Sequence, residues 1–241
     1  MPNDTPDGVL VLHEDWLTQN IATSAASGVR WLVSSDTGNT AFIETGSALG
    51  VTAKGTTDTT DNDMCEIGHG LLAWSAQHGY MAMEVRLQAD VVTTLALTVG
   101  FNDDALDDSN TLPVELSGTT FTSNAGTFVG FVFDTDATND FWHCFMVDDD
   151  ADTTVPIADL NTGVAPVAGE YQTLRVEVYD QGSGKQTRAV FYINGKKYYE
   201  MASAVDRDAL LTPHVAFENH GAAAHVVDIE YITVWMSRPA K

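Results

Sequence analysis

The chain has 241 residues, of which 44% are hydrophobic, so it can bury one large core or two small ones. Its 34 aspartates and glutamates outnumber 11 lysines and arginines, and the formal net charge at pH 7 is −23. This charge excludes nucleic acid and anionic membrane as partners, because binding to either depends on clustered cationic side chains. We expect a soluble protein, made in a cytoplasm, with an acidic surface.

The N-terminal segment is expected to form an arm over residues 1–16. Residues 1–7 are polar, contain two prolines and lack the basic and apolar regions of a secretory signal. Residues 9–16 alternate in the manner of a strand. The short strands expected next are 29–33, 41–44, 48–53 and 64–74, separated by clusters of Ser, Asp, Gly and Asn.

The middle of the chain carries the clearest strand pairs. Residues 81–88 and 95–101 alternate between apolar and polar side chains, which predicts two half-buried strands. Residues 128–133 and 141–147 are apolar without alternation, which is typical of central strands that are buried on both faces. The connection over residues 148–169 is acidic and contains proline and glycine, so we expect it to be irregular.

Residues 171–201 predict an antiparallel meander of three strands. Leu174, Val176 and Val178 alternate with polar neighbours, and a second alternating run begins at Arg188. Asn194-Gly195 then separates two β-rich segments, and this dipeptide favours a type I′ hairpin turn because both of its residues accept positive φ.

Two more strands are expected at residues 214–218 and 225–235. The whole chain therefore shows about a dozen strands without a helical pattern or an internal linker. These features predict an all-β fold, an antiparallel jelly-roll β-sandwich formed as a single domain over residues 17–241.

Three segments of the C-terminal half resemble the concanavalin-like lectin/glucanase sandwich, including its laminin-G-like modules. They are YQTLRVEVYD at 171–180, RAVFYINGK at 188–196 and DIEYITVW at 228–235. The resemblance covers most of the chain and implies a concanavalin-like fold.

A narrower resemblance is to structural proteins of tailed bacteriophages. It spans roughly residues 81–235, without the first eighty residues, and its segments are GTFVGFVFDTDATND at 126–140, NTGVAPVAGEYQTLRVEV at 161–178 and MASAVDRDALLTPHVAFENHGAAAHVVDIEYITV at 201–234. This resemblance implies a non-enzymatic virion protein on the capsid surface. The expected function is capsid decoration, in which the protein binds the major capsid protein and stabilises the head as a cement protein. We also expect self-association as a dimer or trimer, and contact with a neighbour through the N-terminal arm.

A carbohydrate-binding, lectin-like module on a phage fibre or a cell surface is the alternative function. Its partner is a glycan bound on an aromatic platform. A glucan hydrolase of the same fold requires carboxylates in an E-x-D-x-E pattern on one strand. Here Asp228 and Glu230 match, but Val226 stands where the nucleophile is needed. We therefore predict no enzyme and no catalytic residues.

No metal or cofactor is expected. The best calcium candidate is the loop formed by Asp134, Thr135, Asp136, Asn139 and Asp140, but such clusters arise freely in an acidic chain, and a solvated loop is favoured. The other acidic clusters are Asp103-Asp104, Asp107-Asp108 and Asp148-Asp149-Asp150 with Asp152. The seven histidines lack zinc-site spacing, and Cys65 and Cys144 are expected to be reduced and buried.

The aromatic residues suggest which surfaces bind partners. Trp142 and Trp235 lie in apolar strands and are expected in the core. Trp31 and Trp74 have polar neighbours and are the candidates for a glycan or protein interface. Tyr198 and Tyr199, which follow Lys196-Lys197 after the hairpin, are candidates for a protein-contact edge, and Trp16 ends the arm.

Overall fold

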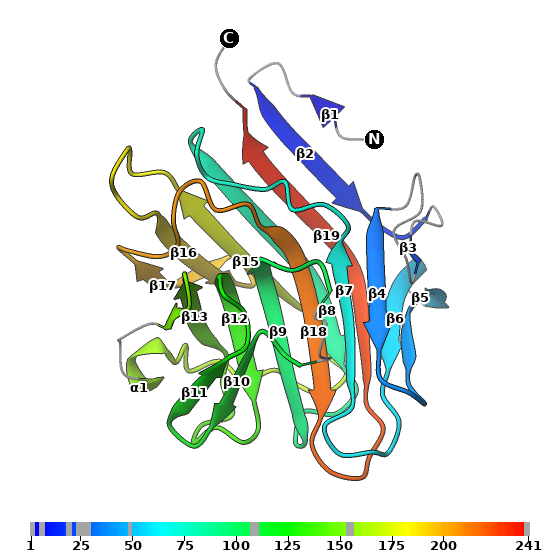
Figure 1. The fold of residues 1–241 in the computed structure, drawn as a ribbon. Coiled ribbons are helices and arrows are strands. Elements are labelled where there is room, and N and C mark those ends of the chain that lie inside the picture. The colour runs from blue at the N-terminus through cyan, green and yellow to red at the C-terminus, as the bar shows by residue number, and fades with distance from the viewer. Residues whose placement is uncertain are drawn as a thin grey trace.

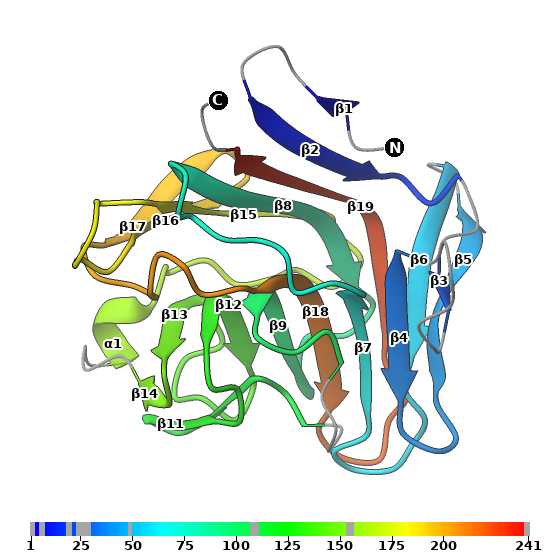
Figure 2. The same ribbon diagram turned by 45° about the horizontal axis from the view of Figure 1, so that its top comes forward.

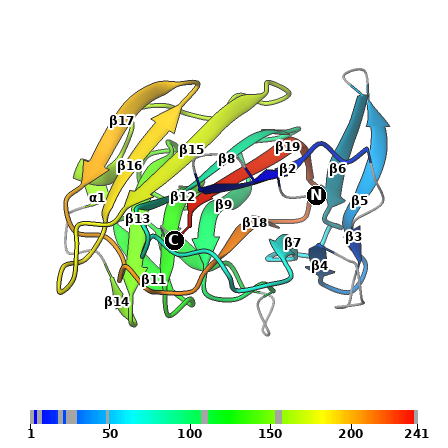
Figure 3. The same cartoon turned by 90° about the horizontal axis from the view of Figure 1, so that it is seen from above.

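The computed structural model describes residues 3–4, 8–17, 21–22, 30–47, 50–106, 111–152 and 157–238. Two β-sheets are stacked as layers, one in front of the other in Figure 1 and side by side in Figure 3, which views the molecule from above. Among the described strands the pairs are antiparallel, except that β3 (Ile21–Ala22) runs parallel to β4 (Trp31–Ser35). The prediction of an all-β antiparallel sandwich is confirmed.

The first sheet is called sheet A. Strand β19 (Val226–Ser237) lies at its centre and pairs with three other strands. In order across the sheet, its path is β1 (Asn3–Asp4), β2 (Val9–Glu14), β19, β8 (Tyr80–Ala89), β15 (Gln172–Tyr179), β16 (Arg188–Ile193) and β17 (Lys196–Met201). Strand β6 (Gly50–Thr56) pairs with the start of β19, and β5 (Thr40–Ser47) pairs with β6.

The second sheet is called sheet B. Its order is β14 (Ala151–Asp152), β13 (His143–Asp148), β12 (Phe128–Asp134), β9 (Leu95–Asn102), β18 (Thr212–Asn219), β7 (Met64–His69), β4 and β3. Strands β9, β12 and β18 are buried along their whole length, as expected for strands covered on both faces.

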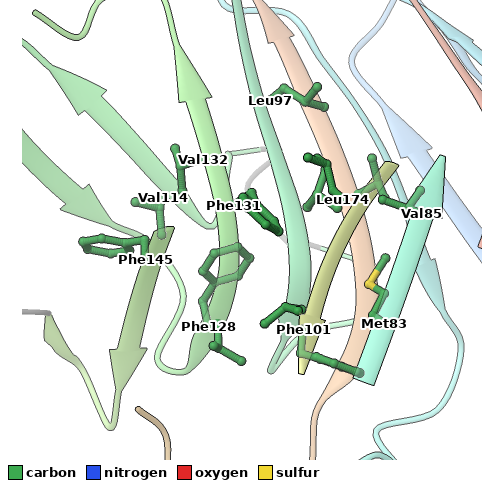
Figure 4. Packing of buried hydrophobic residues seen from close by; sticks show 14 of the residues in the cluster. Met83, Val85, Leu97, Phe101, Val114, Phe128, Phe131, Val132, Phe145 and Leu174 are labelled. Atoms are coloured by element: carbon green, nitrogen blue, oxygen red, sulfur yellow. The ribbon is translucent and has the colours of Figure 1, made fainter. Parts of the chain in front are cut away.

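One face of sheet B packs against sheet A, and the apolar side chains of the two sheets interdigitate there. Figure 4 shows Met83, Val85 and Leu174 of sheet A opposite Phe101 and Phe131 of sheet B. Each of these five side chains is buried. Burial of this core is the main favourable contribution to the free energy of folding.

A hairpin and loops cover the other face of sheet B. Strands β10 (Val114–Ser117) and β11 (Thr120–Ser123) lie over β12 and β13 in Figures 1 and 2, and the rings of Phe121 and Phe145 are 3.9 Å apart. Residues 103–106 lie over β7, so closely that a Cβ atom on Gly68 would be 1.9 Å from the carbonyl oxygen of Ala105. This hairpin was not predicted from the sequence.

The predicted meander is confirmed as β15, β16 and β17. Asn194 and Gly195 have φ values of 50° and 77°, as a type I′ turn requires. The acidic connection after β13 contains one short helix, α1 (Ile157–Leu160). No helix among the described residues is long and apolar enough to span a membrane.

The described parts of the first eighty residues belong to the same sandwich. The strand expected at 29–33 lies two residues later as β4, and those expected at 41–44 and 48–53 are the longer β5 and β6. Strand β2 of the predicted arm pairs with β19 of its own sheet, from Val9 to Glu14. Contact of the arm with a neighbouring molecule stays a prediction.

Candidate functional site

The outer face of sheet A is formed by the polar half of its alternating strands. On β8, Met83 and Val85 point into the core, so Glu84 and Arg86 point outward. Strand β15 is in register with β8, and Arg175 lies opposite Glu84. Strands β6, β19, β16 and β17 continue this surface on either side (Figure 3). We call it the sheet A face.

Ion pairs across the sheet A face balance its charges. Among the described residues, five cationic side chains pair there with five carboxylates. The pairs are Lys54 with Asp228, Arg86 with Glu230, Arg175 with Glu84 and Glu177, and Glu200 with Arg188 and Lys197. The whole chain has a net charge of −23, so this balanced surface is unusual within the molecule.

Tyrosines and arginines stack across the same face. The guanidinium of Arg175 lies 4.3 Å from the ring centroid of Tyr192, and that of Arg188 lies 4.6 Å from the ring of Tyr179. The hydroxyl of Tyr179 donates a hydrogen bond of 2.7 Å to Glu177. Burial and the Glu177 carboxylate raise the pKa of Tyr179 to about 12, so this hydroxyl stays protonated at neutral pH.

A hollow of about 170 Å³ opens at the centre of the sheet A face, and it is lined by Tyr80, Ala82, Arg175, Glu177 and Trp235. Ala82 lies opposite Glu177 on one neighbouring strand and opposite Trp235 on the other. Because a methyl group stands between these two larger side chains, the surface is recessed there. The hollow therefore combines aromatic walls with a cation and a carboxylate.

Asp228 and Glu230, the two carboxylates that match part of the glucan hydrolase pattern, also lie on β19. Asp228 is 3.7 Å from the Lys54 ammonium, and Glu230 pairs with Arg86. A β-bulge between Ile229 and Tyr231 interrupts the alternation of the strand at this point. Both carboxylates are thus held by cations, and the absence of catalysis stays a prediction.

The acidic loop after β12 contributes to a group of metal-ligating atoms that differs from the calcium candidate considered in the sequence. Ligand atoms of Asp134, Asp136 and His220 lie within 4.8 Å of one another. Asp140 does not belong to this group, and Asp107 and Asp108 lie outside the described residues. His220 was missed because it comes from the end of β18, on the other side of β9.

The negative charges of this group can be balanced by a protonated histidine of the chain itself as well as by a metal ion. His220 Nε2 lies 3.2 Å from Glu218, and its Nδ1 lies 3.4 Å from Asp136. These contacts, led by the hydrogen bond with Glu218, raise the pKa of His220 to about 9, so its imidazolium is present at neutral pH. Burial raises the pKa of Asp134 to about 6. Carboxylate oxygens suit Ca²⁺, but a protonated His220 already supplies positive charge.

The structure corrects the predictions for the tryptophans. Trp142 is in the core as expected, whereas Trp235 is half-buried and lines the hollow. The predicted interface candidates Trp31 and Trp74 are 0% and 3% exposed. Trp235 could have been placed correctly, because it alternates with the core residue Val234 on β19.

Other predicted residues also have defined places. Cys65 and Cys144 are free and buried, as predicted. Tyr198 and Tyr199 lie on β17, the last strand of sheet A, and Tyr199 packs against Phe191.

Comparison with protein-family models and with curated protein sequences finds no match. Solved structures do match along nearly the whole chain. The β-glucanase of Bacillus licheniformis has a TM-score of 0.56 at 10% identity, over 95% of this chain and 98% of its own. Peanut lectin has a TM-score of 0.53 at 15% identity, over 94% and 97%. The carbohydrate recognition domain of Emp47p has a TM-score of 0.53 at 12% identity, over 98% and 97%.

These likenesses concern the fold, since identities this low are below the level at which function is shared. Together with the two stacked antiparallel sheets, they show that the chain adopts the concanavalin-like lectin/glucanase jelly-roll fold.

Proposed function

We propose that this protein is a non-catalytic carbohydrate-binding module and that the hollow around Ala82 is its binding site. The observation that carries the proposal is the combination of Trp235 and Tyr80 with Arg175 and Glu177 around one recess. A sugar ring offers an apolar face of C–H groups to an aromatic side chain. Its hydroxyls accept hydrogen bonds from a guanidinium and donate them to a carboxylate.

The electrostatics of the sheet A face favour a neutral sugar. Its described charges are paired with one another, so the face offers little net charge to attract an ionic ligand. A polyanionic glycan has to approach a chain with a net charge of −23, which repels it at long range. The lectins and the β-glucanase among the structural neighbours are, by their names, proteins of carbohydrate recognition or cleavage.

The test is a glycan array followed by titration of the best ligand. We expect Trp235→Ala to weaken binding at least about tenfold, because hot-spot aromatic residues carry much of the binding energy of such sites. Tyr198→Ala is the matched control, since Tyr198 is also a half-buried aromatic residue of sheet A but does not line the hollow. A blank array, or equal losses in both variants, would overturn the proposal.

A second candidate function is adhesion to a phage capsid, as the sequence resemblance implies. The observation that favours it is the exposure of two large apolar side chains, Leu72 and Leu210, which are 43% and 59% exposed. Their segments are joined by backbone hydrogen bonds between Trp74 and Leu211. Large apolar side chains left in solvent can serve as contact points for a partner.

This candidate predicts that the protein sediments with capsids that lack their decoration protein. Changing both Leu72 and Leu210 to serine should then reduce the bound fraction several-fold, whereas Val167→Ser, at an exposed apolar residue elsewhere, should not. Light scattering coupled to size-exclusion chromatography reports the dimer or trimer expected for this function. If the unchanged protein stays in the supernatant, capsid adhesion is excluded under those conditions.

A further inference from the structure

We propose that a second site, an apolar pocket at the open edge of the sandwich, binds a small amphiphile that carries one carboxylate. The pocket has a volume of about 330 Å³, within the range of about 300–1,000 Å³ typical of ligand sites. It is lined by Leu10, Leu12, Arg30, His69, Leu71, Ala73, Trp74 and Met236.

The pocket lies between the two sheets and is separate from the hollow on the sheet A face. Leu10 and Met236 are paired neighbours on β2 and β19 of sheet A. His69 ends β7 of sheet B, and Leu71, which is 65% exposed, follows it. Met236 and Trp235 are adjacent on one strand, so their side chains point to opposite faces. A ligand in the pocket therefore does not compete with a sugar in the hollow.

Two buried polar atoms of the pocket have no partner among the described residues. Trp74 is only 3% exposed, yet its indole Nε1 has no hydrogen-bond partner among the described residues. His69 Nδ1 is also without a partner, and it donates a hydrogen bond only in the tautomer that carries the proton there. A buried donor without a partner is costly, so such groups are expected to receive an acceptor from water or a ligand.

The charge of the pocket indicates which acceptor it takes. Among the described residues, Arg30 is its one charged lining residue and no carboxylate lines it, although the chain has 34 aspartates and glutamates. No ion pair of Arg30 exists among the described residues. Burial lowers the pKa of His69, and the charge of Arg30 lowers it further, so the imidazole is neutral. The leucines and Met236 suit an aliphatic chain, and Arg30 suits a carboxylate head group.

Isothermal titration calorimetry of the full chain with octanoate tests this inference, with 1-octanol and octylamine as ligands of the same length. We expect octanoate to bind more tightly than either. Arg30→Gln should weaken octanoate at least tenfold while changing octanol less than threefold. Lys185→Gln, which removes a cation from an exposed loop, is the matched control and should change neither.

A second variant tests the charge of the pocket without removing Arg30. Ala73 is exposed on the lining, so Ala73→Glu should fold normally, abolish octanoate binding and improve octylamine binding. The proposal is overturned if octanoate does not bind, if octylamine binds the unchanged protein as tightly, or if neither variant alters octanoate affinity. None of these outcomes depends on glycan binding at the hollow.

Discussion

Glu66→Ala is expected to lower the free energy of unfolding by about 3–5 kcal/mol, the usual cost of removing one partner of a buried pair. Glu66 Oε2 lies 3.0 Å from Nε2 of His214, and both side chains are 0% exposed. The two residues lie on β7 and β18, on the face of sheet B that residues 103–106 help to cover. Without Glu66, His214 loses this partner in a place that water does not reach.

Urea unfolding followed by tryptophan fluorescence measures this effect, and Glu66→Gln is the matched control. The glutamine has the same size and offers His214 either a donor or an acceptor, so we expect less than half of the alanine effect. A loss below about 1 kcal/mol in the alanine variant would show that the pair contributes little net stability.

Raising the pH from 7 to 10 is expected to destabilise the protein through His220. Its pKa is about 9 in the folded chain, above the ordinary value of 6.5, so folding binds its proton more tightly. The resulting stabilisation is complete below pH 6.5 and is lost as the pH rises through 9, an effect on the order of 3 kcal/mol. Deprotonation removes the cation that lies among Asp134, Asp136 and Glu218.

His220→Gln isolates this contribution. The variant should be less stable than the unchanged protein at pH 7, and its stability should fall less between pH 7 and pH 10. Titration of Asp134 contributes little to the change in stability between pH 7 and pH 10, because its pKa of about 6 lies below this pH range. His78→Gln, at an exposed histidine, is the control and should leave the pH profile unchanged. Equal slopes for the His220 variant and the unchanged protein would contradict the assignment.

Local patterns were enough to predict the strands that alternate or turn sharply. Asn194-Gly195 specifies its hairpin because few other residues accept positive φ at two successive positions. The apolar run at 128–133 indicated a strand buried on both faces, and β12 is such a strand. Each of these predictions rests on interactions between residues close in sequence.

Which residues form the hollow, and which join His220 in its acidic group, depends on the register between strands that are distant in sequence. In the sequence, nothing distinguishes Ala82 from other small residues. It forms the floor of a hollow because β15 and β19 place Glu177 and Trp235 on either side of it. In the same way, β12 and β18 both flank β9, which brings His220 to Asp134. The pocket beside Arg30 likewise needs β2 and β7 to meet at one edge of the sandwich.

The sequence alone therefore determined the all-β class, the meander and the polar side of each alternating strand, because these depend on backbone geometry and period-two patterning. Only the tertiary structure decided which polar sides meet, and hence where sugars, protons or amphiphiles can bind. A one-residue shift between two strands turns every side chain to the other face, and the sequence of a single strand does not encode its partner's register.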